Sequence, residues 1–166
     1  MRNLFLLFAL KFIAVLLLQV LLFNNIDFLG YISPYIYLIF FFDLPLNFKT
    51  SHLMWLGAAM GLVIDIFSNT IGVHFFASVL LCFVRNAWIG LTFPALNAAQ
   101  NELTLGRVGV LAYLKYIVGL VLLHHTALFL LEAFSLMAFG YTFIRILLNT
   151  VATVLLVLCY EYFRGK

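Results

Sequence analysis

The chain has 166 residues, of which 66% are apolar and 9% are charged, and its formal net charge is +3. Soluble domains are about 25% charged, so this composition excludes a water-soluble domain. The dispersed Lys and Arg residues also exclude a basic stripe for nucleic acid. The length suits a single domain, which we expect to be an integral-membrane domain over residues 1–166. Cys82 and Cys159 lie in apolar runs and are expected to be small buried side chains, not a disulfide or a metal site.

A membrane span needs about 20 mainly apolar residues. On this criterion the sequence predicts an all-α transmembrane bundle of six helices, at about residues 4–23, 29–44, 53–67, 73–93, 110–131 and 141–162. The second of these is short, and Pro34 indicates that it begins irregularly. In the longest loop, 94–109, the stretch 95–103 is a candidate surface helix.

Basic residues are confined to alternate loops. Arg2, Lys49 and Arg107 lie before the first predicted helix, between the second and third, and between the fourth and fifth, and Arg164 and Lys166 lie in the tail. The positive-inside rule therefore places both termini in the cytoplasm. Aromatic residues near the predicted helix ends are expected to be interfacial anchors: Tyr31, Tyr35, Trp55, Trp88, Tyr113, Tyr160 and Tyr162.

The turn between the third and fourth predicted helices is the most polar stretch between two apolar runs. Asp65 and Ser68 share one helix face with Gly61, since they are spaced by three and four residues. Gly57 and Gly61 form a small-xxx-small pair, which lets a neighbouring backbone approach closely. His74 opens the next helix, and we expect it to hydrogen-bond Asp65 across a tight turn.

Each later helix also carries polar side chains. Glu132 and Arg145 are a natural ion pair across the last two helices. Arg85 is expected to reach an acceptor on another helix or to extend to the cytoplasmic surface. His124 and His125 are adjacent, so on a regular helix they point about 100° apart and do not easily ligate one metal ion. We expect no metal and no cofactor.

Three interpretations of these polar groups remain open. They hold helices together, they line a cavity that is open to the outer side and binds a ligand, a lipid headgroup or a partner, or they serve catalysis or proton relay. No nucleophile motif, phosphate-binding glycine loop or zinc-protease spacing is present, so we expect no enzymatic activity. Lys11 is expected to extend to the cytoplasmic surface and Asp43 to be solvated.

Residues 61–77, GLVIDIFSNTIGVHFFA, resemble the signature hairpin of MreD, a family of rod-shape-determining membrane proteins. The likeness rests on a Gly followed by Asp65, a small polar turn with Gly72, and a small residue in the next helix. Three further stretches are similar to the same family: 30–37, 82–85 and 116–134.

The resemblance implies a non-enzymatic scaffold in the inner membrane of a bacterium, within the machinery of cell elongation. It implies binding to the transmembrane helix of MreC, and a complex with MreB filaments, RodA and its transpeptidase. The implied bundle is similar to the substrate-binding subunits of energy-coupling-factor vitamin transporters, and such a subunit is the alternative function. That alternative calls for an Ala-x-x-x-Ala face in the first helix, and Ala9 and Ala14 do not have this spacing.

Overall fold

The computed structural model describes residues 2–26, 28, 30–94, 103–133 and 139–165. All elements in this part of the chain are helical, and five of them are long and apolar enough to cross a membrane. In chain order the elements are α1 (Arg2–Leu21), the 3₁₀ turn η1 (Phe23–Asn25), α2 (Leu38–Phe42), α3 (Thr50–Ser68), α4 (Val73–Thr92), α5 (Leu105–Val108), α6 (Val110–Ala133) and α7 (Phe139–Arg164).

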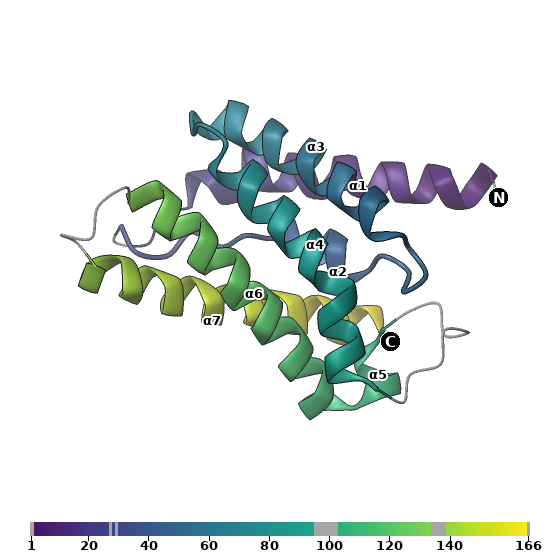
Figure 1. The fold of residues 1–166 in the computed structure, drawn as a ribbon. Coiled ribbons are helices and arrows are strands. Elements are labelled where there is room, and N and C mark those ends of the chain that lie inside the picture. The colour runs from purple at the N-terminus through teal and green to yellow at the C-terminus, as the bar shows by residue number, and fades with distance from the viewer. Residues whose placement is uncertain (1, 27, 29, 95–102, 134–138, 166) are drawn as a thin grey trace.

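The long helices pack mainly against their neighbours in the sequence. The packing of α3 against α4 is the most extensive, followed by α4 against α6 and α6 against α7, whereas α1 makes fewer contacts with α3 and α2. In Figure 1 the short α2 lies between α1 and α3 on one side and α6 and α7 on the other. Both termini lie toward the same end of the bundle.

The helix expected over residues 29–44 is the main error of the sequence prediction. Only Leu38–Phe42 form an α-helix there, and residues 31–37 are irregular. Pro34 has no amide hydrogen and disfavours the helical conformation at the preceding residue, and Gly30 has a positive φ of 76°. The apolar run that follows is fully compatible with a helix, so the sequence pattern alone does not reveal the break.

This irregular segment runs through the interior of the bundle instead of facing lipid. Tyr35 and Tyr37 of this segment are buried, and so is every residue of the α2 helix that follows. Irregular backbone at membrane depth is tolerated only where it is enclosed by protein, since unsatisfied peptide groups are very costly in hydrocarbon. Side chains from other helices must therefore bind this segment, and they are described below.

Two tyrosines and one cysteine differ from their expected surroundings. Tyr35 and Tyr113, expected as interfacial anchors, are 6% and 1% exposed and belong to the core. Trp55, in contrast, is 77% exposed. Cys82 is buried but Cys159 is exposed, and both are free. The candidate surface helix 95–103 has all but its last residue outside the described part of the chain.

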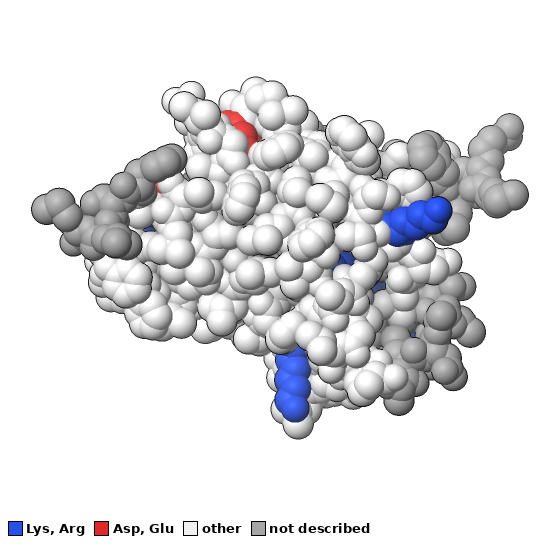
Figure 2. All heavy atoms as spheres, viewed as in Figure 1, with Lys and Arg blue, Asp and Glu red and all other residues white. Residues whose placement is uncertain are grey.

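The outer surface is apolar, as expected for contact with lipid. Figure 2 shows a face with very few Lys, Arg, Asp or Glu side chains among the described residues. α1 contributes five leucines that are exposed by 47% or more: Leu6, Leu7, Leu10, Leu17 and Leu21.

Candidate functional site: a polar core and two apolar grooves

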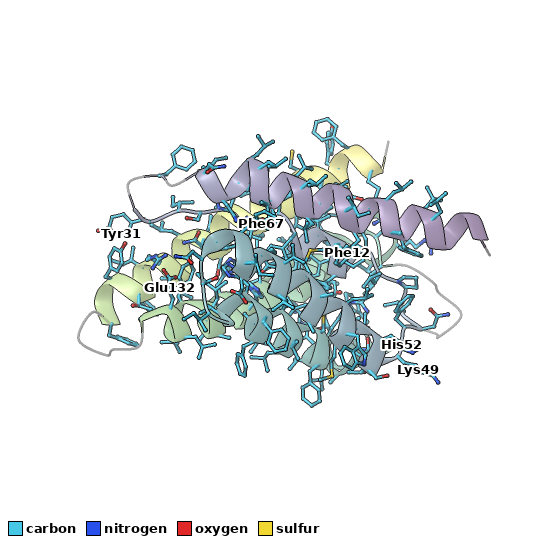
Figure 3. The ribbon with its side chains drawn as sticks, turned by 90° about the horizontal axis from the view of Figure 1, so that it is seen from above. Phe12, Tyr31, Lys49, His52, Phe67 and Glu132 are labelled. Atoms are coloured by element: carbon cyan, nitrogen blue, oxygen red, sulfur yellow. The ribbon has the colours of Figure 1, made fainter. Side chains whose placement is uncertain are left out.

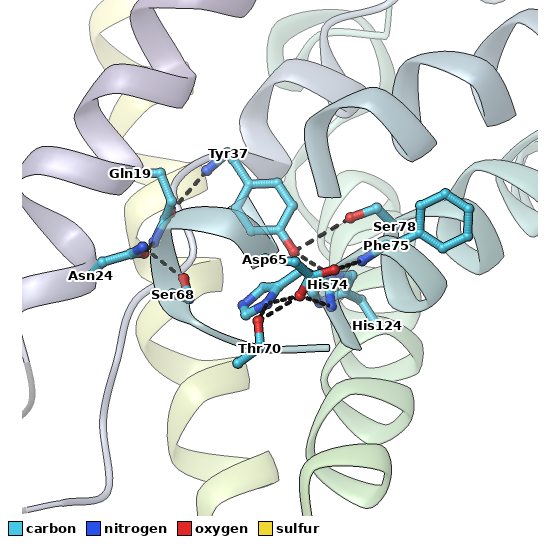
Figure 4. A network of polar contacts seen from close by, with 10 residues as sticks. All are labelled: Gln19, Asn24, Tyr37, Asp65, Ser68, Thr70, His74, Phe75, Ser78 and His124. Atoms are coloured by element: carbon cyan, nitrogen blue, oxygen red, sulfur yellow. Dashed lines mark hydrogen bonds and ion pairs between the residues drawn. The ribbon is translucent and has the colours of Figure 1, made fainter. Parts of the chain in front are cut away.

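Asp65 is the centre of the polar turn between α3 and α4 (Figure 4). Its Oδ1 accepts hydrogen bonds from Thr70 Oγ1 at 2.5 Å, from the His74 amide at 3.0 Å and from His74 Nδ1 at 3.0 Å. Its Oδ2 accepts from the Phe75 amide at 2.9 Å. The carboxylate therefore caps the first turn of α4, where free amide groups and the helix dipole favour a negative charge. The hydrogen bond expected between Asp65 and His74 is present.

The turn itself is made by residues that accept the left-handed conformation. Asn69 has a φ of 53° and Gly72 one of 73°. The amides of Asn69 and Thr70 both donate to the Asp65 carbonyl, which ends α3. Backbone and side chain of Asp65 thus join the end of one helix to the start of the next.

Gly57 and Gly61 lie on the face of α3 that packs against α4 in this hairpin. A Cβ atom at Gly61 would lie 2.5 Å from the His74 carbonyl oxygen and 2.6 Å from Phe75 Cα. At Gly57 it would lie 2.9 Å from Cys82 Sγ. Both glycines therefore permit the close approach of α3 and α4 that the small-xxx-small pattern predicts.

Side chains of α1 and α7 bind the irregular segment before α2. Asn149 Nδ2 donates to the Tyr31 carbonyl at 2.7 Å, and Asn149 Oδ1 accepts from the Ser33 amide at 2.7 Å. Thr153, one turn further along α7, accepts from the Tyr35 amide at 3.3 Å. These contacts replace the hydrogen bonds that a continuous helix would have made.

Gln19 supplies the same support from α1. Its Oε1 accepts from the Tyr37 amide, and its Nε2 donates to the Pro34 carbonyl, both at 3.4 Å. Gln19 also donates to Asn24 Oδ1 at 2.9 Å, and Asn24 donates to Ser68 Oγ at the same distance. Ser68 is therefore linked to α1, and the roles of Gln19 and Asn24 were not foreseen from the sequence.

The three core histidines surround the two tyrosines of the irregular segment. Tyr37 Oη lies 2.6 Å from His124 Nε2, and the Tyr35 ring lies 5.1 Å from the His125 ring and 5.8 Å from the His74 ring. His125 Nδ1 donates to the Val121 carbonyl at 2.8 Å. Within the described residues, no group of three His, Cys, Asp or Glu side chains is arranged to hold a metal ion.

Arg85 is completely buried and reaches backbone instead of a carboxylate. Its Nη2 donates to the Leu44 carbonyl, just beyond α2, and its Nη1 donates to Asn86 Oδ1 at 3.3 Å. Asn86 donates to the Phe48 carbonyl at 2.9 Å. Of the two alternatives expected for Arg85, the structure has the acceptor within the bundle. Both side chains hold the connection between α2 and α3.

The ion pair expected between Glu132 and Arg145 is present, and it joins the end of α6 to the first part of α7. Both terminal nitrogens of Arg145 lie 3.2 Å from Glu132 Oε1. The guanidinium also lies over the Phe129 ring, 4.4 Å from its centroid. The Glu132 side chain is 40% exposed, so this pair lies at the margin of the core.

Asp43 is not solvated, which corrects the expectation from the sequence. Its side chain is 5% exposed and pairs with Lys11 of α1 and with Arg164 of α7, the latter at 2.6 Å. Tyr160 Oη donates to Asp43 Oδ2 at 2.7 Å. Lys11 therefore binds protein instead of simply extending to the surface. Arg164 also pairs with Glu161 at 2.9 Å.

A large apolar groove lies on the outside of the bundle between α1 and α3. Its volume is about 540 Å³, and apolar and aromatic side chains line it, among them Phe8, Phe12 and Trp55, with Ala9 and Ala59 between them. Edge-to-face contact between the rings of Phe12 and Phe40, 5.3 Å apart, fixes its floor. Figure 3 shows His52, which also lines the groove, beside Lys49 at the start of α3.

A second groove, of about 500 Å³, lies between α4 and α6 and includes one lysine, Lys115. Neither groove is lined by the core residues Asp65, His74, His124 or His125. The hydrogen bonds described above join groups of the polar core to one another, whereas His124 Nδ1 and His125 Nε2 have no hydrogen-bond partner among the described residues. The two grooves offer binding surfaces on the outside.

No protein-family model, curated protein or solved structure matches this chain.

Proposed function

We propose that this protein is a scaffold of the MreD kind, which binds the single transmembrane helix of MreC in the inner membrane of a rod-shaped bacterium. Through MreC it would join MreB filaments to RodA and its transpeptidase. In this proposal both termini face the cytoplasm. The proposal is supported by the hairpin resemblance around Asp65 and by five helices that are long and apolar enough to cross a membrane.

The observation that carries the proposal is the apolar groove between α1 and α3. Association of helices in lipid is driven by close van der Waals packing, and small residues allow it. Ala9 and Ala59 offer such positions on the two walls, and Trp55 is exposed beside them. Since α1 makes few contacts within the bundle, a partner helix in this groove would bury apolar surface of both α1 and α3.

The packing of the interior argues against the alternative, a vitamin-binding subunit. Such a subunit needs a pocket in the core for a polar ligand. Here Tyr35 and Tyr37 are buried in the core, and both rings contact the core histidines. Asp65, which would be a natural ligand-binding group, already accepts hydrogen bonds from four donors.

Binding of MreC in the α1–α3 groove can be tested by filling the groove with a larger side chain. Ala59→Trp places a bulky side chain in the groove from an exposed position, so the α3–α4 packing stays intact. We expect MreC co-purifying with this variant to fall at least fivefold, and the cells to lose their rod shape. Val151→Trp is the matched control, because Val151 is 58% exposed on α7 and lies outside the groove. Equal recovery of MreC with both variants would contradict the proposed docking site.

Depletion of the protein separates the scaffold from the transporter. We expect depleted cells to become round whatever vitamins the medium contains, because a scaffold acts on wall synthesis. A strain that kept its shape and failed to grow only in vitamin-poor medium would refute the scaffold function.

A further inference from the structure

The groove between α4 and α6 differs from the α1–α3 groove because a charged side chain lines it. Its walls are Trp88, Leu91 and Thr92 from α4 and Lys115, Val118 and Gly119 from α6. Leu91 is 76% exposed and Val118 is 38% exposed. The groove is thus open to the surroundings of the bundle and has an apolar part and a cationic part.

Trp88 is held in place as a fixed wall of this groove. Its Nε1 donates to the Tyr116 carbonyl of α6 at 3.2 Å. A Cβ atom at Gly119 would overlap Cζ2 of the indole, so only glycine at this position lets the ring lie against α6. The indole of α4 is thus held against α6 by a hydrogen bond and by close packing on Gly119.

Lys115 is an exposed cation in the second turn of α6. Among the described residues, no carboxylate forms an ion pair with it. A lysine in a spanning helix is costly unless its ammonium reaches the interface or an anionic partner. Basic pockets between helices bind the headgroups of anionic lipids for this reason.

We propose that the α4–α6 groove binds an anionic phospholipid, with its phosphate on Lys115 and an acyl chain against Leu91 and Val118. Thr92 Oγ1 donates its proton to the Trp88 carbonyl at 2.8 Å, so its lone pairs are free to accept from a headgroup hydroxyl. This arrangement favours phosphatidylglycerol, which carries both a negative phosphate and hydroxyl groups. The inference goes beyond the scaffold function and does not depend on it.

The test measures lipid binding to the purified full-length protein by native mass spectrometry. Phosphatidylglycerol and phosphatidylcholine with identical acyl chains are compared, so that only the headgroup differs. We expect wild-type protein to bind phosphatidylglycerol at least fivefold more tightly. Lys115→Gln should remove this preference, and Lys115→Arg should keep it. Lys49→Gln is the matched control, since Lys49 is exposed at the start of α3 and outside the groove.

A second variant tests the acyl-chain part of the groove independently of charge. Leu91→Trp fills the groove from an exposed position and should weaken binding of both lipids. Equal binding of the two lipids by wild-type protein, or an unchanged preference in Lys115→Gln, would overturn the proposal. If Lys115→Gln instead lowered the recovery of MreC and left lipid binding unchanged, the groove would be a protein-binding surface and the proposal would be wrong.

Discussion

Asp65 and Asp43 are two buried carboxylates that hold the bundle in different ways. Asp65 lies in the last turn of α3, and its donors are within ten residues along the chain, two of them backbone amides of α4. Asp43 lies at the end of α2, and its partners come from α1 and α7, 32 to 121 residues away. The first carboxylate fixes one hairpin, and the second joins three distant segments.

The two sites also differ in how far their partners can adapt. The amides that bind Asp65 cannot leave it while α4 remains helical. Lys11 and Arg164 have long side chains that are 30% and 24% exposed, so they can turn to water or headgroups when Asp43 is lost. We therefore expect substitution of Asp65 to lower the stability of the protein more than substitution of Asp43 does.

The largest expected effect is that of Asp65→Ala. It leaves several donors of the α3–α4 turn without an acceptor, and hydrogen bonds to charged groups each contribute about 1.5–3 kcal/mol. Because such losses are not additive, we expect a destabilisation of about 3 kcal/mol overall. Thermal unfolding in detergent measures it, and Ile66→Ala, at a 69% exposed position one residue on, is the control. Similar melting temperatures for both variants would show that the cap does not stabilise the hairpin.

Asp43→Asn should have a smaller effect. Breaking a fully buried ion pair costs about 3–5 kcal/mol, but partners that can reach water lower this to about 1–2 kcal/mol. The double variant Asp43→Asn with Lys11→Met should recover part of the loss, because the uncompensated ammonium is removed. A double variant that is less stable than Asp43→Asn would show that Lys11 contributes mainly through Tyr160, 2.8 Å away.

Thr70→Val sharpens the comparison by removing one donor from Asp65 and leaving the others. We expect a loss of about 1 kcal/mol, the net contribution of a single hydrogen bond. The measurement is again the melting temperature, compared with Asp65→Ala. If Thr70→Val were as damaging as Asp65→Ala, the backbone amides would contribute little to the cap.

The smallest effect is expected for Glu132→Gln. The pair with Arg145 is partly exposed, and such pairs contribute only about 0–1 kcal/mol. Arg145 also keeps its contact with the Phe129 ring. A shift in melting temperature comparable to that of Asp43→Asn would mean that the partly exposed Glu132–Arg145 pair stabilises the protein as much as the buried ion pairs of Asp43 do.

The same contrast explains what the sequence could predict. The ends of the five long helices can be predicted from the sequence to within about three residues, because long apolar runs separated by polar stretches leave few alternative positions for the helix ends. The Asp65 hairpin was also predictable, since its groups lie close together in the chain. Glu132 and Arg145 lie near the facing ends of two consecutive long helices, so their pairing could be predicted from the helix order.

Other features depend on contacts that no local pattern encodes. The partners of Asp43 lie far away in the sequence, and the break before α2 is stabilised by Gln19, Asn149 and Thr153 from two other helices. An apolar run next to Pro34 fits a spanning helix as well as it fits a buried irregular segment. Burial of Tyr35 likewise follows from the path of that segment and not from its residue type.

Photo-crosslinking in cells tests the central claim. In this claim the α1–α3 groove binds the partner helix, and the polar core only stabilises the packing of the helices. A photoreactive phenylalanine is placed at Trp55 in the α1–α3 groove or at Phe83, which is 57% exposed on α4 and outside both grooves. We predict a crosslink to MreC from position 55 and none from position 83. A crosslink from position 83 without one from position 55 would contradict the account.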